Sequence, residues 1–108
     1  MTSPTTSNDE FWAAAAPLLE NGRAQPGTIM GGECLRAGKE FLAMPHHKGP
    51  GIVVKLPRER VASLIEAGDG QPFSPNGRVF REWVLVEGHD HTRWTELLLE
   101  AHAFVTAS

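Results

Sequence analysis

The stretch GPGIVVKLPRERVASLIEAG, residues 49–68, contains the clearest structural pattern in the chain. It opens with a short run of mostly β-branched residues bounded by glycine and proline, which is typical of a β-strand. Pro57 follows, and proline fits the first turn of a helix because its missing N–H would have no partner there. Apolar residues then recur at helical spacing up to Gly68, where a glycine commonly ends a helix. A strand that leads directly into a helix folded back over it predicts a small α+β domain. The apolar residues are Ile52, Val53, Val54 and Leu56 in the strand, and Val61, Leu64 and Ile65 in the helix.

Turn and breaker residues divide the rest of the chain into further elements. A capping box of Ser7 and Glu10 predicts the start of a helix, and Pro17 predicts either a kink near Ala16 or a second short turn. Asp90 is the expected N-cap of the last helix, whose apolar stripe should pack on the sheet. The residues expected to be buried in these two helices are Phe11, Trp12, Leu18, Leu19, Trp94, Leu97, Leu98, Ala101, Phe104 and Val105.

Short apolar runs predict the strands. A hairpin is expected across Ala37-Gly38, because two apolar runs flank a two-residue loop that contains glycine. Residues 69–78 are rich in Gly, Pro, Asn and Asp, which favours a loop held in place by Phe73. The order of elements predicts a single α+β domain with a mostly antiparallel sheet of about five strands. The expected strands are Thr28–Met30, Glu33–Arg36, Lys39–Met44, Ile52–Leu56 and Val79–Glu87.

Length and composition narrow the class of protein. A chain of 108 residues forms one domain with a modest core. We expect residues 1–8 to be a disordered lead without signal-peptide character and residues 9–108 to form the domain. No apolar run approaches the roughly 20 residues of a membrane span. Cys34 is the single cysteine, which excludes an internal disulfide, fits a reducing compartment and predicts a cytoplasmic protein. Cys34 itself is expected to be a small core residue rather than a reactive thiol.

Charge is distributed unevenly along the chain. The net charge is −3, which argues against general affinity for phosphate backbones. Residues 36–81 contain eight Lys or Arg and four acids, a net of +4, while the two flanks are acidic. This pattern fits either a basic patch or charges scattered over several faces, and scattering is the preferred interpretation.

Six motifs occur in order along residues 28–105: Met30-Gly31-Gly32, Gly38–Ala43, Val54-Lys55-Leu56, Gln71-Pro72-Phe73 with Gly77-Arg78, Arg81–Val86, and the helix of Trp94 and Ala101. On these motifs, residues 28–105 resemble the TfoX N-terminal domain, with a looser likeness to the YjbR/MmcQ family. The resemblance implies a curved antiparallel sheet with helices packed on its outside. It also implies a regulatory role, because relatives are named for competence regulation or labelled DNA-binding. The chain lacks the aromatic residue that the family has between its Met and Gly-Gly.

Two sets of residues are candidates for a binding site. The histidines His46, His47, His89 and His91 lie in two loops that could hold a divalent metal if folding brought them together, and solvated loop histidines are the alternative. The cations Lys55, Arg58, Arg60, Arg78 and Arg81 could contact nucleic acid, with Arg58 beside a helix N-terminus suited to phosphate. Solvated surface charge is the alternative here, since exposed aromatic residues are not expected between these cations: Phe80 and Trp83 look like core residues.

No catalytic motif is present. The chain has no G-x-S-x-G and no phosphate-binding glycine frame, so we predict neither an enzyme nor a cofactor. The expected function is a regulatory interaction module that binds a protein or DNA. The alternative is a small-molecule or metal-binding domain that uses the sheet face or the histidine loops. We expect no membrane association and a monomer or homodimer, in which an edge strand such as Thr28–Met30 could pair with its copy.

Overall fold

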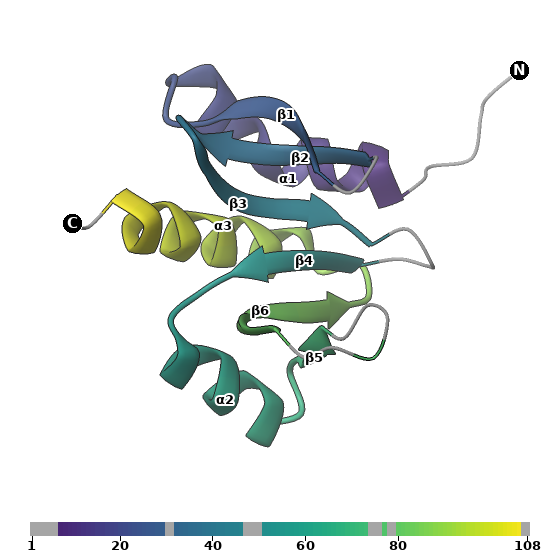
Figure 1. Ribbon diagram of the computed structural model, residues 1–108. Helices are drawn as coiled ribbons and strands as arrows, with labels where there is room; N and C mark the ends of the chain where they lie inside the picture. The colour runs from purple at the N-terminus through teal and green to yellow at the C-terminus, as the bar shows by residue number, and fades with distance from the viewer. Residues whose placement is uncertain (1–6, 30–31, 47–50, 74–76, 78–79, 107–108) are drawn as a thin grey trace, which may run out of the picture.

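The computed structural model describes residues 7–29, 32–46, 51–73, 77 and 80–106 (Figure 1). These ranges contain three helices and six strands. In chain order they are α1 (Ser7–Glu20), β1 (Gln25–Ile29), β2 (Gly32–Ala37), β3 (Glu40–Pro45), β4 (Gly51–Lys55), α2 (Arg58–Glu66), β5 (Gln71–Phe73), β6 (Phe80–Glu87) and α3 (His91–Thr106).

The strands form one antiparallel sheet in the order β1-β2-β3-β4-β6-β5. β4 lies inside this sheet between β3 and β6, with Val53 opposite Leu85. β1 and β5 are the two edges, and each contains a proline, Pro26 and Pro72. Proline is tolerated at a sheet edge because the missing N–H can face away from the neighbouring strand. The expected α+β class, with a curved antiparallel sheet and helices packed outside it, is confirmed.

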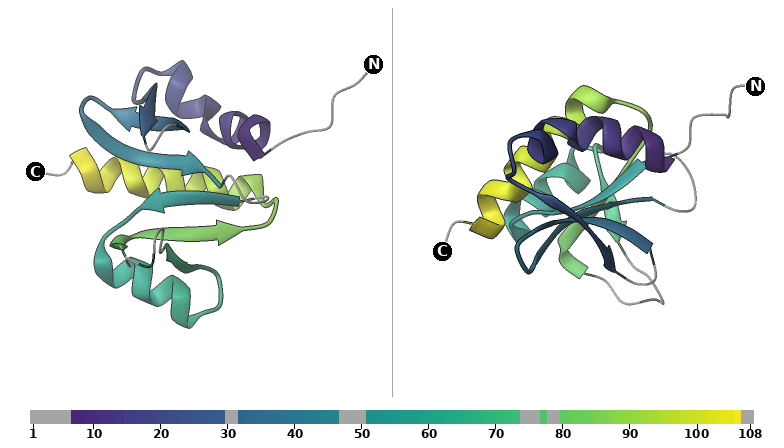
Figure 2. Two further views of the ribbon diagram at one scale, coloured as in Figure 1. Left: turned by 45° about the vertical axis from the view of Figure 1, so that its right-hand side comes forward. Right: turned by 90° about the horizontal axis from the view of Figure 1, so that it is seen from above.

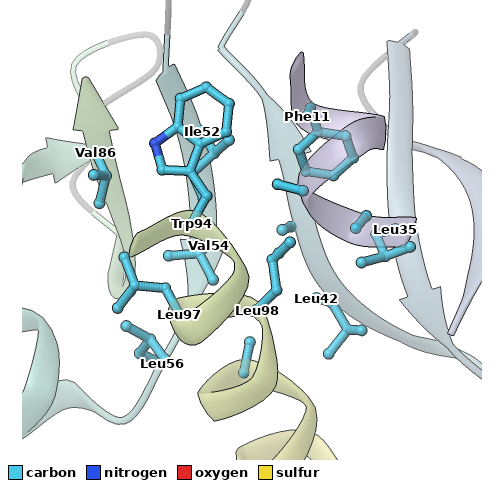
Figure 3. Packing of buried hydrophobic residues seen from close by; sticks show 14 of the residues in the cluster. Phe11, Leu35, Leu42, Ile52, Val54, Leu56, Val86, Trp94, Leu97 and Leu98 are labelled. Carbon is cyan, nitrogen blue, oxygen red and sulfur yellow. The ribbon is translucent and has the colours of Figure 1, made fainter. Parts of the chain in front are cut away.

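The helices cover one side of the sheet, as Figure 2 shows for α1 and α3. Ile52 and Val54 of β4 point toward them, and α3 contributes four fully buried side chains to the same cluster (Figure 3). α2 extends this layer over the β6 and β5 end of the sheet, where it buries Val61 and Leu64. The buried α3 residues are Trp94, Leu97, Leu98 and Ala101, as the helical stripe predicts.

The ends of the helices follow the sequence signals closely. The Asp90 side chain accepts a hydrogen bond from the Arg93 N–H at 3.0 Å, so the predicted cap of α3 is confirmed. Gly68 follows the end of α2 with a φ of 80°, a left-handed conformation that glycine adopts without strain. Pro57 lies one position before the first residue of α2, at the N-cap, with a φ of −56°.

Pro17 does not interrupt α1, so of the two predicted alternatives the separate short turn after Pro17 is wrong. The helix runs continuously from Ser7 to Glu20 with Pro17 exposed on its outer side. Proline removes one helical hydrogen bond, but Phe11, Ala15 and Leu18 are all fully buried on either side of it. Burial of these side chains against the sheet offsets the lost bond.

The segment predicted as a loop after α2 contains a sixth strand, β5. Phe73 of β5 pairs with Phe80 of β6 and is buried, with 8% of its surface exposed. The composition favoured a loop because Pro72 rarely lies in a central strand. As an edge strand, β5 accommodates this proline. The β2–β3 hairpin is confirmed, with its turn one residue later than predicted, at Gly38-Lys39.

We predict that Leu98→Ala lowers the free energy of unfolding by about 2–5 kcal/mol, because it leaves a cavity between α3 and the sheet. Its neighbour Leu99 is 40% exposed and provides a matched control. Leu99→Ala should change stability by less than about 0.5 kcal/mol. Urea unfolding of both variants measures the difference, and equal losses would contradict the described packing of α3.

Candidate nucleic-acid interface

A second apolar cluster lies on the side of the sheet opposite the helices. Neighbouring residues of a strand point to opposite faces, so Val53 faces away from the layer that Ile52 and Val54 contact. Four residues of this cluster are buried and four are half-buried. No helix residue of the described ranges belongs to this cluster. The buried members are Cys34, Met44, Val53 and Phe73, and the half-buried members are Phe41, Phe80, Trp83 and Leu85.

Three of the four half-buried residues of this cluster are aromatic. Trp83 lies at its centre, with ring centroids of Phe41 at 4.4 Å, Phe80 at 4.9 Å and Phe73 at 5.4 Å. The Phe80 and Trp83 rings are nearly parallel, with an interplanar angle of 22°. The prediction that Phe80 and Trp83 are core residues is therefore wrong in part, since both pack in a cluster but keep exposed surface.

Positively charged side chains border these rings. Lys55, Arg58 and Arg81 line one hollow of about 330 Å³ together with Phe80, Glu82 and Trp83. We call this hollow and its lining the Trp83 surface. Lys55 faces the rings because it follows Val53 by two residues and pairs directly with Trp83 across the sheet. Lys55 comes from β4, Arg58 from the start of α2 and Arg81 from β6, so three different elements each contribute one cation.

The net charge of this surface depends on which cations are already paired. Lys55 has Glu40 at 4.0 Å, and with Glu40 58% exposed this is a weak, solvent-screened pair. Arg58 and Arg81 are both exposed and have no ion-pair partner within the described ranges. The Trp83 surface therefore offers two arginines for an anionic ligand.

A smaller, apolar hollow adjoins the Trp83 surface. It measures about 210 Å³ and lies between α2 and strands β5 and β6. Its walls shared with the larger hollow are Arg58, Phe80, Arg81 and Trp83, and its own are Val61, Ala62, Ile65 and Pro72. The two hollows together present apolar and cationic groups side by side.

The five predicted cations do not all meet at this site. Arg60 lies on the other side of α2, where its guanidinium donates to both carboxylate oxygens of Glu100 in α3 at 2.9 and 3.2 Å. Arg60 therefore ties two helices together and lies apart from the hollow that Lys55, Arg58 and Arg81 line. Arg78 lies outside the described residues. Three of the five cations, Lys55, Arg58 and Arg81, are brought together.

Arg36 is a further cation that the sequence did not single out. It follows Cys34 by two residues in β2 and lies opposite Phe41 of β3, so alternation places it on the same face as the rings. Its side chain passes over Gly27 of β1, where a Cβ atom would lie 2.2 Å from the Arg36 Cδ. Because side chains alternate along a strand, Arg36 could have been placed on the same face as Cys34 from the sequence. That inference required knowing that this face carries the rings.

The predicted histidine loops contain a different arrangement. His89 Nδ1 lies 2.6 Å and His91 Nε2 3.0 Å from the same oxygen, Glu10 Oε1. Glu10 of α1 is buried. Its carboxylate accepts a hydrogen bond from each imidazole and thereby joins the starts of α1 and α3. His46 is half-buried after β3, and His47 lies outside the described residues.

The described members of this set do not assemble a metal site. Within the described ranges, no group of three or more His, Cys, Asp or Glu residues is arranged to hold a metal ion. Cys34 is 1% exposed, and burial raises the pKa of its thiol while the Arg36 charge opposes the shift. The prediction that Cys34 is a core residue is confirmed.

Comparison with protein-family models, curated proteins and solved structures gave no match. The site must therefore be interpreted from its own geometry. Among the described residues, no helix is long and apolar enough to cross a membrane.

We predict that Glu10 stabilises the fold in a pH-dependent way. The hydrogen bond to His89 lowers the pKa of the Glu10 carboxyl from its ordinary 4.5, burial opposes this shift, and His91 adds to it. A carboxyl with a lowered pKa in the folded state contributes stability that is fully present above the unfolded pKa and is lost as pH falls through the folded pKa. Glu10→Gln should therefore be less stable than the native protein near neutral pH, and the difference should shrink below about pH 4.5.

Urea unfolding of both proteins across this pH range measures the effect. Glu20→Gln, at the exposed far end of α1, is the control and should show a much smaller difference. A Glu10→Gln deficit that stays constant down to about pH 3 would contradict the assigned interaction.

Proposed function

We propose that the protein is a non-catalytic interaction module that binds nucleic acid through the Trp83 surface. The observation that carries this proposal is the convergence of Lys55, Arg58 and Arg81 on one hollow beside half-exposed aromatic rings. A cytoplasmic regulator of the TfoX N-terminal type is the biological setting that we propose for this activity. The antiparallel α+β architecture is consistent with that resemblance.

Charge at this surface supports an anionic ligand. The chain as a whole carries −3, but the lining of the hollow has three cations and one acid, Glu82. Arginine suits phosphate especially well because its planar guanidinium donates two parallel hydrogen bonds. Local concentration of cations, rather than net charge, is what a phosphate backbone meets.

The start of α2 adds to the same field. Arg58 is the first residue of α2, whose N-cap, Pro57, makes no side-chain capping hydrogen bond. The first N–H groups of a helix carry partial positive charge and favour a nearby anion. This contribution reinforces the arginines.

Binding is favoured over catalysis by the types of residues in the hollow. Its described lining contains no histidine or thiol, and Glu82 is its single carboxylate. General acid–base chemistry usually needs such a group with a perturbed pKa near the reacting atoms. The hollow instead combines permanent positive charge with apolar rings.

A small anionic ligand with an apolar part is the second candidate. The observation in its favour is the apolar hollow of about 210 Å³, which continues into the cationic one. Its volume is below the roughly 300–1,000 Å³ of typical ligand pockets. We therefore rank it behind nucleic acid.

We predict that the purified protein binds labelled DNA in a titration and that the binding weakens strongly between about 50 and 200 mM salt. Arg58→Ala and Arg81→Ala should each weaken binding and reduce the slope of log K against log salt by about 1. Arg60→Ala is the matched control, since Arg60 has the same charge and lies on the same helix but is paired with Glu100.

Absence of binding at low salt, where electrostatic attraction is strongest, would overturn the proposed function. Loss of affinity in Arg60→Ala equal to that in Arg58→Ala would also count against it. That result would indicate a general charge effect rather than this surface.

A further inference from the structure

The Trp83 surface has features that a double helix does not use. Phosphates of a duplex are accessible to any basic patch, but its bases are stacked on one another and turn only their edges outward. A single strand can also place its bases flat on aromatic side chains. The distribution of rings and cations therefore distinguishes the two ligands.

Rings and cations alternate along the side of the sheet opposite the helices. Arg36 lies opposite Phe41 in the β2–β3 pair, and Lys55 lies opposite Trp83 in the β4–β6 pair. At the α2 end, Arg58 and Arg81 line the hollow that Phe80 and Trp83 also line. Phe41 and Phe80 both pack on Trp83, at 4.4 and 4.9 Å, so the rings form a continuous cluster.

The rings around Trp83 are less completely buried than the aromatic rings of the main cluster. Trp94 and Phe11 in the main cluster are completely buried, whereas Phe41, Phe80 and Trp83 all remain half-buried. Exposed aromatic surface is costly in water. Placing it among cations makes a surface that is apolar for bases and positive for phosphates.

We infer that this face binds single-stranded nucleic acid, with the backbone along Arg36, Lys55, Arg58 and Arg81 and with bases packed against the exposed surface of the ring cluster around Trp83. The inference rests on the proposed function and narrows its ligand from nucleic acid in general to an unpaired strand. The apolar hollow beneath α2 is the place for a base next to Phe80. Base–aromatic stacking is tolerant of sequence, so the binding should show little sequence preference.

The test compares four labelled probes of equal length. Three share one sequence: a DNA single strand, its duplex and the corresponding RNA strand. The fourth is a DNA strand in which the bases are replaced by abasic sites. The abasic strand keeps the phosphates and loses the stacking, so it requires no change to the protein. The single strand should bind more tightly than the abasic strand by roughly 5- to 150-fold for each stacked base. It should also bind more tightly than the duplex.

Protein variants then locate the interaction. Phe80→Leu and Trp83→Leu should reduce binding of the single strand toward that of the abasic strand, so that the ratio of the two affinities falls. Trp12→Leu is the control, because Trp12 is half-buried on α1 and packs against the main cluster. Urea unfolding shows whether each variant is folded, and the abasic comparison with native protein stands even if Trp83→Leu is not.

The outcomes separate the inference from the proposed function. Equal, salt-dependent binding of the single strand and the abasic strand would overturn the inference and leave the proposed function intact. Tighter binding of the duplex would do the same. Failure of all four probes to bind at low salt would overturn both. Tighter binding of the RNA strand than of the DNA strand would support the inference and identify RNA as the ligand.

Discussion

Burial of β4 on both faces is the constraint on which the rest of the structure depends. Ile52 and Val54 point into the cluster beneath the helices, and Val53 points into the cluster on the other side. All three side chains are fully buried, so other side chains cover β4 on both faces of the sheet. α1 and α3 cover one face, whereas the other is covered by rings from β3, β5 and β6. The aromatic cluster thus supplies the packing that this side of the central strand needs, and none of its described members comes from a helix.

Under the proposed function, this double role links the stability of the sheet to ligand binding. Phe73 is almost buried and completes the small cluster, while Phe41, Phe80 and Trp83 surround it and keep surface in contact with solvent. Packed rings have few accessible rotamers, so a ligand that stacks on them orders little that is not already ordered. The positions of the arginines follow from the same framework, since β6 and the start of α2 are held together by the main core.

Much of the fold was predictable because its signals are local. Alternation and β-branching in Ile52–Val54, the cap at Asp90 and the glycine at Gly68 each describe a neighbourhood of a few residues. β5 and the continuous path of α1 were not predictable in this way, because tertiary burial on both sides of Pro17 and edge pairing at Pro72 override the local preference. The site was harder still: Arg58 and Arg60 are two residues apart on one helix, and only packing against α3 decides that Arg60 pairs with Glu100. Likewise, nothing near His89 in the sequence indicates Glu10 as its partner, 79 residues away.

The prolines in the two edge strands have a consequence for how this domain can associate. A proline at the edge removes a donor from the outward-facing row of backbone groups that another chain would use to extend the sheet. With Pro26 in β1 and Pro72 in β5, both ends of the sheet carry such an interruption. Growth by strand addition, whether into a paired dimer, with a captured extended peptide, or toward an aggregate, is therefore disfavoured at either end.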